Sequence, residues 1–263
     1  MIRQLVAVLA GALTAAGAAA AGLDSIADPA VKACIARAMP EQSLKHSVTL
    51  RALDDAGVRS QSAGEIFWRR DVQGSQRATI RVSEPASRNG MMVLVIEREA
   101  KDPQFFLYLP DLGRARKITG KQISTDMMDT DFSYEEFSHL QTMSRSSETV
   151  RVEDQAIDGR PVYVLQTTPQ DGASMYKEIL TFVDQERCIP LRSQFIAPGG
   201  EVRKELVAVP EEIRQIGERF VPHKVIMYDR AKASRTELTI DDVEIDVELS
   251  DALFNPKSFG KSQ

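Results

Sequence analysis

The chain has 263 residues, of which 43% are hydrophobic, and its 33 basic and 38 acidic residues give a formal net charge of −5. This charge argues against a nucleic-acid-binding protein, which usually has a strongly basic face, and two cysteines are too few for a disulfide-rich mini-domain or a four-cysteine zinc site. A chain of this length hides about 70–75% of its unfolded surface, which is enough for one large domain or two small ones.

Residues 1–21 have the layout of a secretory signal peptide. Arg3 precedes an apolar run that begins at Leu5, and small residues up to Ala21 offer A-x-A cleavage sites. The run is shorter than the about 20 apolar residues that a membrane-spanning helix needs, and an uncleaved N-terminal anchor is the alternative. We therefore expect residues 22–263 to form an exported mature protein, whose net charge is −6 because Arg3 is lost.

The two cysteines, Cys34 and Cys188, are far apart in the sequence. In an oxidising compartment they could form a disulfide, because such compartments preserve disulfide bonds. Two separate buried thiols are equally compatible with the sequence, so the pairing stays open at this point.

The mature chain begins with a helical pattern over residues 24–40. Asp28 and Pro29 fit the N-cap and the first helical position, and Pro40 ends the run. After Pro40 the hydrophobic period changes to two, which is typical of half-buried strands. Further strand-like runs lie at 60–70, 77–82, 91–97, 105–109, 114–118, 150–156, 161–167, 177–184, 190–196, 201–209, 221–229 and 234–249.

The last of these runs changes register. Its apolar residues are even-numbered at Leu238 and Ile240 but odd-numbered from Val243 onward, which predicts a bulge near Asp241-Asp242. The acidic residues that alternate with them predict a solvated outer face more readily than a cation site.

A second helix is expected near 131–140, in the middle of the strand-rich chain. No long linker divides the sequence, so we predict a single domain of mainly β structure with some α-helix. Roughly a dozen antiparallel strands would form one large curved sheet with helices over its concave face, because a sheet of that size must curl or close.

The sequence contains no concentrated catalytic motif. The three histidines have no metal-binding spacing, the cluster of Asp126, Asp129 and Asp131 lacks the order of an EF-hand loop, and no G-x-S-x-G elbow is present. We therefore predict no catalytic, metal or cofactor site, and a binding or carrier protein rather than an enzyme. An esterase is the enzymatic alternative, but no nucleophile with a nearby base supports it.

Residues 105–137 carry the most distinctive motif. A hydrophobic strand ends in Leu107-Tyr108-Leu109-Pro110, a basic strand follows with Arg114 and Arg116, and Asp131-Phe132-Ser133-Tyr134-Glu135 opens the second helix. This order resembles the LolA-like family of outer-membrane lipoprotein-sorting proteins. The chain departs from the family pattern at Met128-Asp129-Thr130, where a Gly-Ser is common, and at Glu136, where Asp is usual.

The resemblance implies a half-open β-barrel of about eleven antiparallel strands that is closed by helices and holds lipid or acyl chains. It also implies a monomeric periplasmic carrier, without nucleic acid or cofactor, that ferries lipids or lipoproteins towards the outer membrane alongside an inner-membrane transporter of the resistance-nodulation-division (RND) type. The alternative is a periplasmic sensor module of the same fold that binds a protein partner.

Candidate site residues follow from that carrier hypothesis. Adaptable or aromatic side chains near the second helix are lid candidates, namely Met127, Met128, Phe132 and Phe137. Strand residues predicted for the cavity wall are Ile66, Trp68, Met92, Leu94, Phe106 and Tyr108. Ordinary core packing is the alternative for each, because alternation does not say which face of a strand looks into the hollow. The basic residues Arg114, Arg116 and Lys117 could meet a lipid headgroup or an acidic partner, or form a solvated face.

Overall fold

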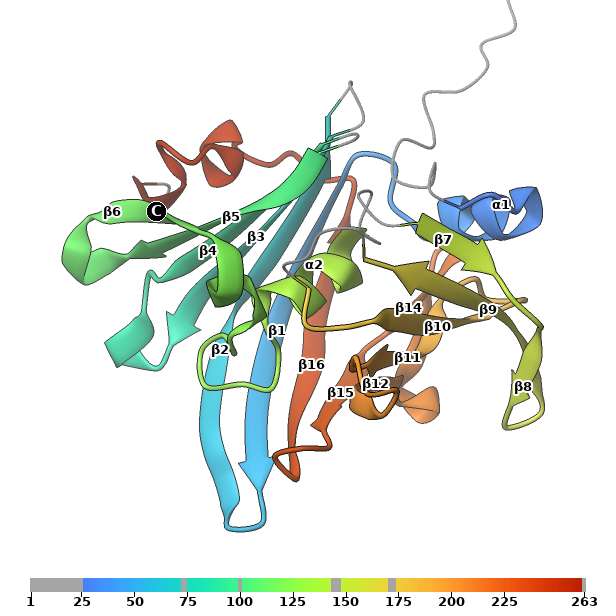
Figure 1. The fold of residues 1–263 in the computed structure, drawn as a ribbon. Helices are drawn as coiled ribbons and strands as arrows, with labels where there is room; N and C mark the ends of the chain where they lie inside the picture. The colour runs from blue at the N-terminus through green and yellow to red at the C-terminus, as the bar shows by residue number, and fades with distance from the viewer. Residues whose placement is uncertain (1–25, 72–74, 99–100, 143–147, 170–173, 262–263) are drawn as a thin grey trace, which may run out of the picture.

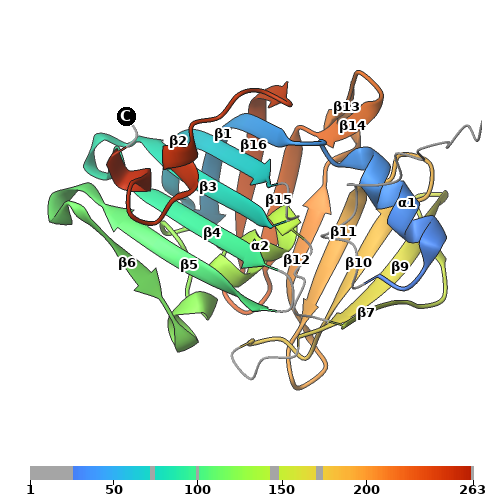
Figure 2. The same ribbon diagram turned by 90° about the horizontal axis from the view of Figure 1, so that it is seen from above.

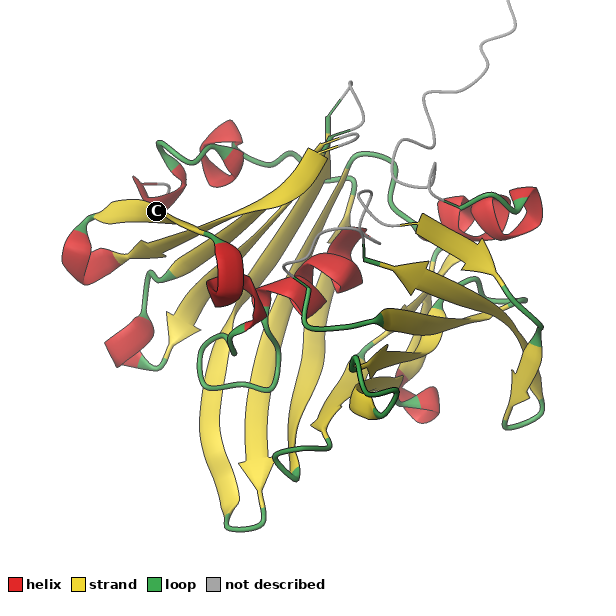
Figure 3. Ribbon diagram, in the orientation of Figure 1, coloured by secondary structure: helices red, strands yellow, loops and turns green. Residues whose placement is uncertain are grey.

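A large antiparallel sheet forms the body of the protein in a computed structural model that describes residues 26–71, 75–98, 101–142, 148–169 and 174–261 (Figure 1). The predicted signal peptide, residues 1–21, lies outside the described residues. The sheet has 14 strands in the spatial order β6-β5-β4-β3-β2-β1-β16-β15-β12-β11-β10-β9-β7, and β8 pairs with β9. Figure 3 shows how strands dominate over helices.

The strands of this sheet are β1 Ser43–Asp54, β2 Gly57–Arg70, β3 Gln76–Glu84, β4 Met92–Arg98, β5 Lys101–Leu109, β6 Arg114–Ile118, β7 Glu148–Arg151, β8 Gln155–Ile157, β9 Arg160–Thr168, β10 Glu178–Asp184, β11 Pro190–Ile196, β12 Val202–Ala208, β15 Lys224–Asp229 and β16 Ser234–Ile245. A separate hairpin pairs β13 Ile213–Ile216 with β14 Arg219–Pro222. The helices are α1 Pro29–Ala38 and α2 Tyr134–Thr142. Short 3₁₀ turns are η1 Ala86–Arg88, η2 Pro110–Leu112, η3 Gly120–Ser124, η4 Pro210–Glu212, η5 Asp251–Phe254 and η6 Phe259–Lys261.

The predicted fold class, mainly β with one large curved antiparallel sheet, is confirmed. The sheet begins at β6 and ends at β7, and these two strands do not pair with each other. The sheet is therefore open rather than closed into a barrel, and helices and turns cover its faces instead.

The predicted bulge in β16 is also present. Ser47 of β1 pairs with Asp242, but the next residue, Val48, pairs with Ile240, so Asp241 is the extra residue. The bulge lets Ile240 and Val243 lie on the same face of the sheet, although their numbers differ in parity.

The predicted strand over 221–229 is divided in the structure. β14 ends at Pro222 in the hairpin, and β15 begins at Lys224 in the large sheet. Pro222 has no backbone N–H to donate to a ladder, which disfavours continuous pairing through this position.

The concave face carries the largest apolar core. Side chains from both halves of the sheet contribute to it: Val48, Ile66, Trp68, Ala78, Ile80, Val82, Val93, Val95, Phe105, Leu107, Ile118, Ile179, Phe195, Leu206, Met227 and Ile240. α2 lies across this face (Figure 1), and its buried side chains belong to the same core. The concave side of the sheet is thus filled by a helix from the middle of the chain.

The opposite, convex face is covered by the C-terminal turns. Phe67, Leu94 and Ile96 of the sheet pack there against Phe254 and Phe259. Figure 2 shows these turns and α2 on opposite sides of the sheet. We call residues 250–261 the C-terminal cover.

α1 covers the far end of the concave side. Its N-cap is Asp28, whose carboxylate accepts hydrogen bonds from the backbone of Ala30 and Val31, as predicted. Val31 packs against β9 and β10. A disulfide joins Cys34 to Cys188, with their Cα atoms 5.1 Å apart, and so ties α1 to the turn between β10 and β11. Within the described part of the chain, no helix is long and apolar enough to cross a membrane.

Candidate functional site

α2 begins with a reciprocal cap. The Ser133 hydroxyl accepts a hydrogen bond from the Glu136 amide at 3.4 Å, and the Glu136 carboxylate accepts one from the Ser133 amide at 2.5 Å. This is the capping box that the spacing Ser-x-x-Glu favours. The helix therefore starts at Tyr134, three residues after the beginning of the predicted range 131–140, and Ser133 caps it.

Six predicted site residues meet on the concave face. Met127, Phe132 and Phe137 precede or belong to α2, and they share one buried core with Ile66 and Trp68 of β2. Met128 is only partly buried at the edge of this core. We call residues 127–142 the lid segment, because they cover the concave face without being part of the sheet.

The other four predicted wall residues lie on the convex face. Val93 and Leu107 are in the concave core, so their neighbours in β4 and β5 point the other way. Met92, Leu94, Phe106 and Tyr108 accordingly pack in the convex cluster with the C-terminal cover. One cavity cannot be lined by both groups, and the sequence offers no signal that separates them.

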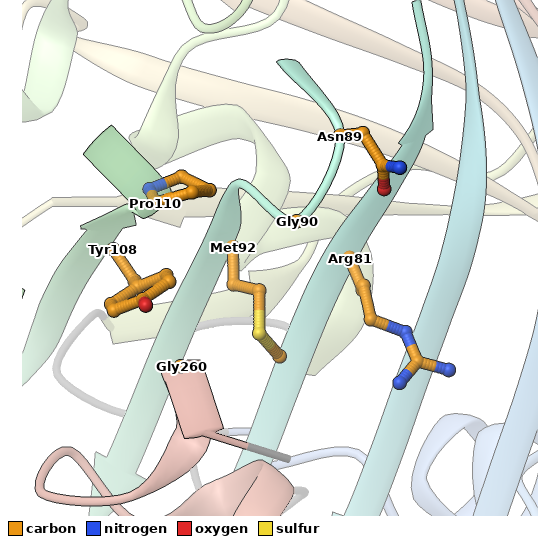
Figure 4. A pocket seen from close by; sticks show the side chains of 7 residues that line it. All are labelled: Arg81, Asn89, Gly90, Met92, Tyr108, Pro110 and Gly260. Atoms are coloured by element: carbon orange, nitrogen blue, oxygen red, sulfur yellow. The ribbon is translucent and has the colours of Figure 1, made fainter. Parts of the chain in front are cut away.

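Met92 and Tyr108 line a pocket on the convex side (Figure 4). Its volume is about 410 Å³, and Arg81 lies opposite the Tyr108 ring. Gly260 of the C-terminal cover approaches that ring so closely that an added Cβ would come within 2.2 Å of it. The Arg81 guanidinium donates to Glu65 at 2.5 Å, so its charge is compensated within the sheet.

The lid segment is held in place by buried charge as well as by apolar contacts. The Asp131 side chain has no exposed surface, and it accepts hydrogen bonds from Ser234 at 2.6 Å and Thr236 at 2.6 Å. Arg59 of β2 forms an ion pair with it at 3.1 Å. Asp131 therefore joins the start of the lid segment to two strands of the sheet.

Lys204 is the second anchor of the lid segment. Its ammonium group donates to the Asp131 carbonyl at 2.7 Å and to the Glu136 carboxylate at 3.1 Å, and only 1% of its side chain is exposed. The Tyr176 hydroxyl donates to the other oxygen of Glu136. Burial and the nearby Glu136 carboxylate raise the pKa of Tyr176, so the phenol stays protonated and remains a donor.

Sequence reasoning missed Lys204, although a signal was present. Lys204, Leu206 and Ala208 are alternate residues of one strand, so they lie on the same face. A lysine in register with two apolar residues is a candidate for a buried, paired charge.

A smaller pocket lies beside the lid segment on the concave side. It has a volume of about 200 Å³ and is lined by Arg88, Met91, Val93, Leu107, Asp126, Met128, Asp129 and Tyr134. This is below the roughly 300–1,000 Å³ of typical ligand pockets. A larger guest therefore requires the lid segment to move.

His139 is the titratable group nearest the end of α2. Burial lowers its pKa to about 4, so the imidazole is neutral at pH 7. Its Nε2 lies 3.3 Å from the Thr181 hydroxyl, and its ring packs edge-on against Phe195. Across the described ranges, no three His, Cys, Asp or Glu side chains are grouped so that they could hold a metal ion.

Three solved structures have a similar fold. A putative outer membrane lipoprotein-sorting protein domain from Vibrio parahaemolyticus has a TM-score of 0.77 at 20% identity, with 86% of this chain and 94% of that chain covered. A DUF1329 family protein from Desulfovibrio piger has a TM-score of 0.76 at 19% identity, with the same coverage. A LolA superfamily protein from Nitrosomonas europaea has a TM-score of 0.65 at 17% identity, with 86% and 97% covered.

The sequence comparisons identify a family but no activity. No curated protein sequence matches the chain. A family model described as "Uncharacterized protein" matches residues 74–261, which is more than half of the chain. The protein therefore belongs to the family that this model describes, and its fold is that of the LolA-like proteins.

Proposed function

We propose that the protein is a carrier that binds acyl chains of lipids or lipoproteins on the concave face of its sheet, with the lid segment as a displaceable cover. The observation that carries this proposal is that a segment of the chain itself fills the apolar concave face. Met127, Phe132 and Phe137 occupy the core positions there, and an acyl chain of similar polarity could replace them.

The energetics of exchange favour such a role. Each buried CH₂ group of a guest contributes about 0.8 kcal/mol, which offsets the loss of apolar contacts by the lid side chains. The charged groups of Asp131, Glu136 and Lys204 are buried when the lid segment is closed. Opening breaks the hydrogen bonds and ion pairs of these groups, but each group regains hydration, which offsets part of that loss.

We propose further that the protein works in the periplasm, moves its cargo towards the outer membrane and cooperates with an inner-membrane RND-type transporter. The signal-like sequence of residues 1–21 supports export, and the disulfide between Cys34 and Cys188 is typical of an oxidising compartment. N-terminal sequencing of protein from a periplasmic fraction should find a start near residue 22, and a start at residue 1 would contradict cleavage.

Lipid binding is tested on the full mature chain. Native mass spectrometry of protein purified from periplasm should detect bound lipid, and the delipidated protein should bind a fluorescent fatty acid saturably. The absence of both co-purifying lipid and saturable binding would refute the carrier function.

Two matched phenylalanines test where the fatty acid binds. Phe137 is buried in the lid segment and Phe254 in the C-terminal cover. Phe137→Ala should weaken lid closure and raise the apparent affinity several-fold, because apparent affinity scales with the open fraction. Phe254→Ala should leave the affinity unchanged, since it lies on the other face; an equal effect of both changes would argue against the concave site.

A further inference from the structure

Strand β6 forms the edge of the sheet next to the concave pocket. Arg116 pairs with Leu107, and Arg114 pairs with Leu109. Cross-strand partners point to the same face and have their Cβ atoms about 5 Å apart. Leu107 lines the 200 Å³ pocket beside the lid segment, so Arg116 lies at the mouth of that pocket and Arg114 follows on the same face.

The charges around this mouth are unbalanced. The two carboxylates in the pocket lining already have cationic partners: Asp126 pairs with Lys232, and Asp129 pairs with Arg88. Among the described residues, no ion pair involves Arg114 or Arg116, and both side chains are exposed.

The interior of the pocket has a different character from its mouth. Met91, Val93, Leu107 and Met128 give it apolar walls. Tyr134 also lines this pocket. Burial raises its pKa, and the nearby Arg116 guanidinium acts in the opposite direction, which places Arg116 within electrostatic reach of the pocket wall.

From this arrangement we infer that the carrier selects anionic lipids, with an acyl chain on the concave face beneath the displaced lid segment and a phosphate group on Arg114 and Arg116. The inference rests on the proposed carrier function and specifies its substrate class. Guanidinium groups match phosphate oxygens with paired, charge-assisted hydrogen bonds. Two of them on one face of an edge strand offer such bonds without displacing an internal carboxylate.

The test compares two lipids with identical acyl chains, phosphatidylglycerol and phosphatidylcholine, as ligands of the delipidated full chain. The wild type should bind phosphatidylglycerol about tenfold more tightly, as expected for a charge-assisted contact. The preference should shrink as salt concentration rises, because the mouth is exposed. The double variant Arg114→Gln with Arg116→Gln should lose the preference, because its affinity for phosphatidylglycerol falls more than its affinity for phosphatidylcholine. Both lipids carry the phosphate, but the choline cation of phosphatidylcholine offsets that charge in the wild type.

Lys117→Gln is the matched control. Lys117 is exposed on the same strand, but it pairs with Phe106 and so faces the convex side. This variant removes one positive charge without touching the pocket mouth and should keep the lipid preference. If Lys117→Gln and the arginine variant reduce the preference equally, general surface charge explains it and the inference fails.

Two further results separate the possible sources of the charge contact. Glycerol phosphate, which has no acyl chain, should not compete with phosphatidylglycerol at similar concentrations. Effective competition by it, or by a polyglutamate peptide, would indicate an anion or acidic-peptide site instead of a lipid site. Equal binding of the two lipids by the wild type overturns this inference but not the carrier function, whereas binding of neither lipid overturns the carrier function itself.

Discussion

The two faces of the sheet are covered in different ways. On the concave side, the lid segment combines apolar contacts with buried charges, chiefly Asp131, Glu136 and Lys204. On the convex side, the C-terminal cover relies on Leu253, Phe254 and other apolar side chains, with Thr79 donating one buried hydrogen bond to the Leu253 carbonyl.

This difference has a physical consequence. Apolar side chains gain nothing from water when a cover opens, whereas buried charges regain hydration. The lid segment is therefore suited to reversible displacement, and the C-terminal cover to permanent closure. The predictions below test this division, from the largest expected effect to the smallest.

Phe254→Ala tests the permanent cover. The Phe254 ring is fully buried, and the Arg69 guanidinium lies 4.6 Å from its centroid. We expect the free energy of unfolding to fall by about 4 kcal/mol because the change leaves a cavity. Urea denaturation measures the loss. Leu112→Ala is the control, since Leu112 is 56% exposed; a loss below 1 kcal/mol for Phe254→Ala would mean that the cover contributes little.

Lys204→Met tests the charged anchor of the lid segment. It leaves the buried Glu136 carboxylate without its ammonium partner, so the free energy of unfolding should fall by about 3 kcal/mol. Methionine refills the apolar volume of the lysine stem, which keeps the loss at the lower end of the usual range. Unlike Phe254→Ala, this change should also raise the affinity for a fluorescent fatty acid, because the lid segment opens more readily.

Lys45→Met provides the control for that experiment. Lys45 also forms an ion pair, with Glu244 at 2.7 Å, but on the convex side and 28% exposed. Surface ion pairs contribute roughly 0–1 kcal/mol, so we expect little loss of stability and no change in fatty acid affinity. Similar effects of both substitutions would contradict a special role for the lid anchor.

The double variant Cys34→Ser with Cys188→Ser tests whether α1, like the lid segment, takes part in fatty acid binding. The disulfide ties α1 to the sheet, whereas the lid segment has no such bond. Loss of the disulfide should reduce the free energy of unfolding by about 2–3 kcal/mol and speed hydrogen exchange in α1. Fatty acid affinity should stay the same; a clear change in affinity would show that α1 also takes part in opening.

His139 makes the lid segment sensitive to acid. Burial lowers its pKa to about 4 in the folded state, whereas an unfolded histidine titrates near 6.5. The unfolded state therefore binds the proton first, and stability is lost as the pH falls from about 6.5 towards 4. At pH 5.5 the loss is about 1.2 kcal/mol relative to pH 7.

Unfolding measured across this pH range checks the acid sensitivity of His139. His139→Leu should flatten the dependence by about half. His46 retains the remainder, because burial lowers its pKa to about 4 as well and the nearby His223 adds to the shift. An unchanged slope in His139→Leu would show that other groups control the acid response.

Much of the local structure was predictable from sequence. Alternation located most strands, and the parity change near Asp241 revealed the bulge, because a strand with one buried face needs that correction. Asp28 and Pro29 marked the start of α1 correctly. The motif from Leu107 to Glu135 identified the LolA-like fold, which the solved structures confirm.

The candidate site was only partly predictable. The hydrophobic runs in β4 and β5 are apolar on both faces, so no periodicity distinguishes inward from outward residues there. Met92 and Tyr108 consequently appeared equivalent to Ile66 and Trp68, although they face the C-terminal cover. Residues 250–261 have no strong period of their own, and their role as a cover was not predicted.

By itself, the sequence determined the strand-rich fold class, the bulge and the start of the first helix, because these depend on neighbours along the chain. Only the tertiary structure decided which face of each strand meets the lid segment, that Cys34 reaches Cys188, and that Lys204 lies beside Glu136. Those contacts join residues far apart in the chain, and the pairing of strands, rather than any local pattern, brings them together.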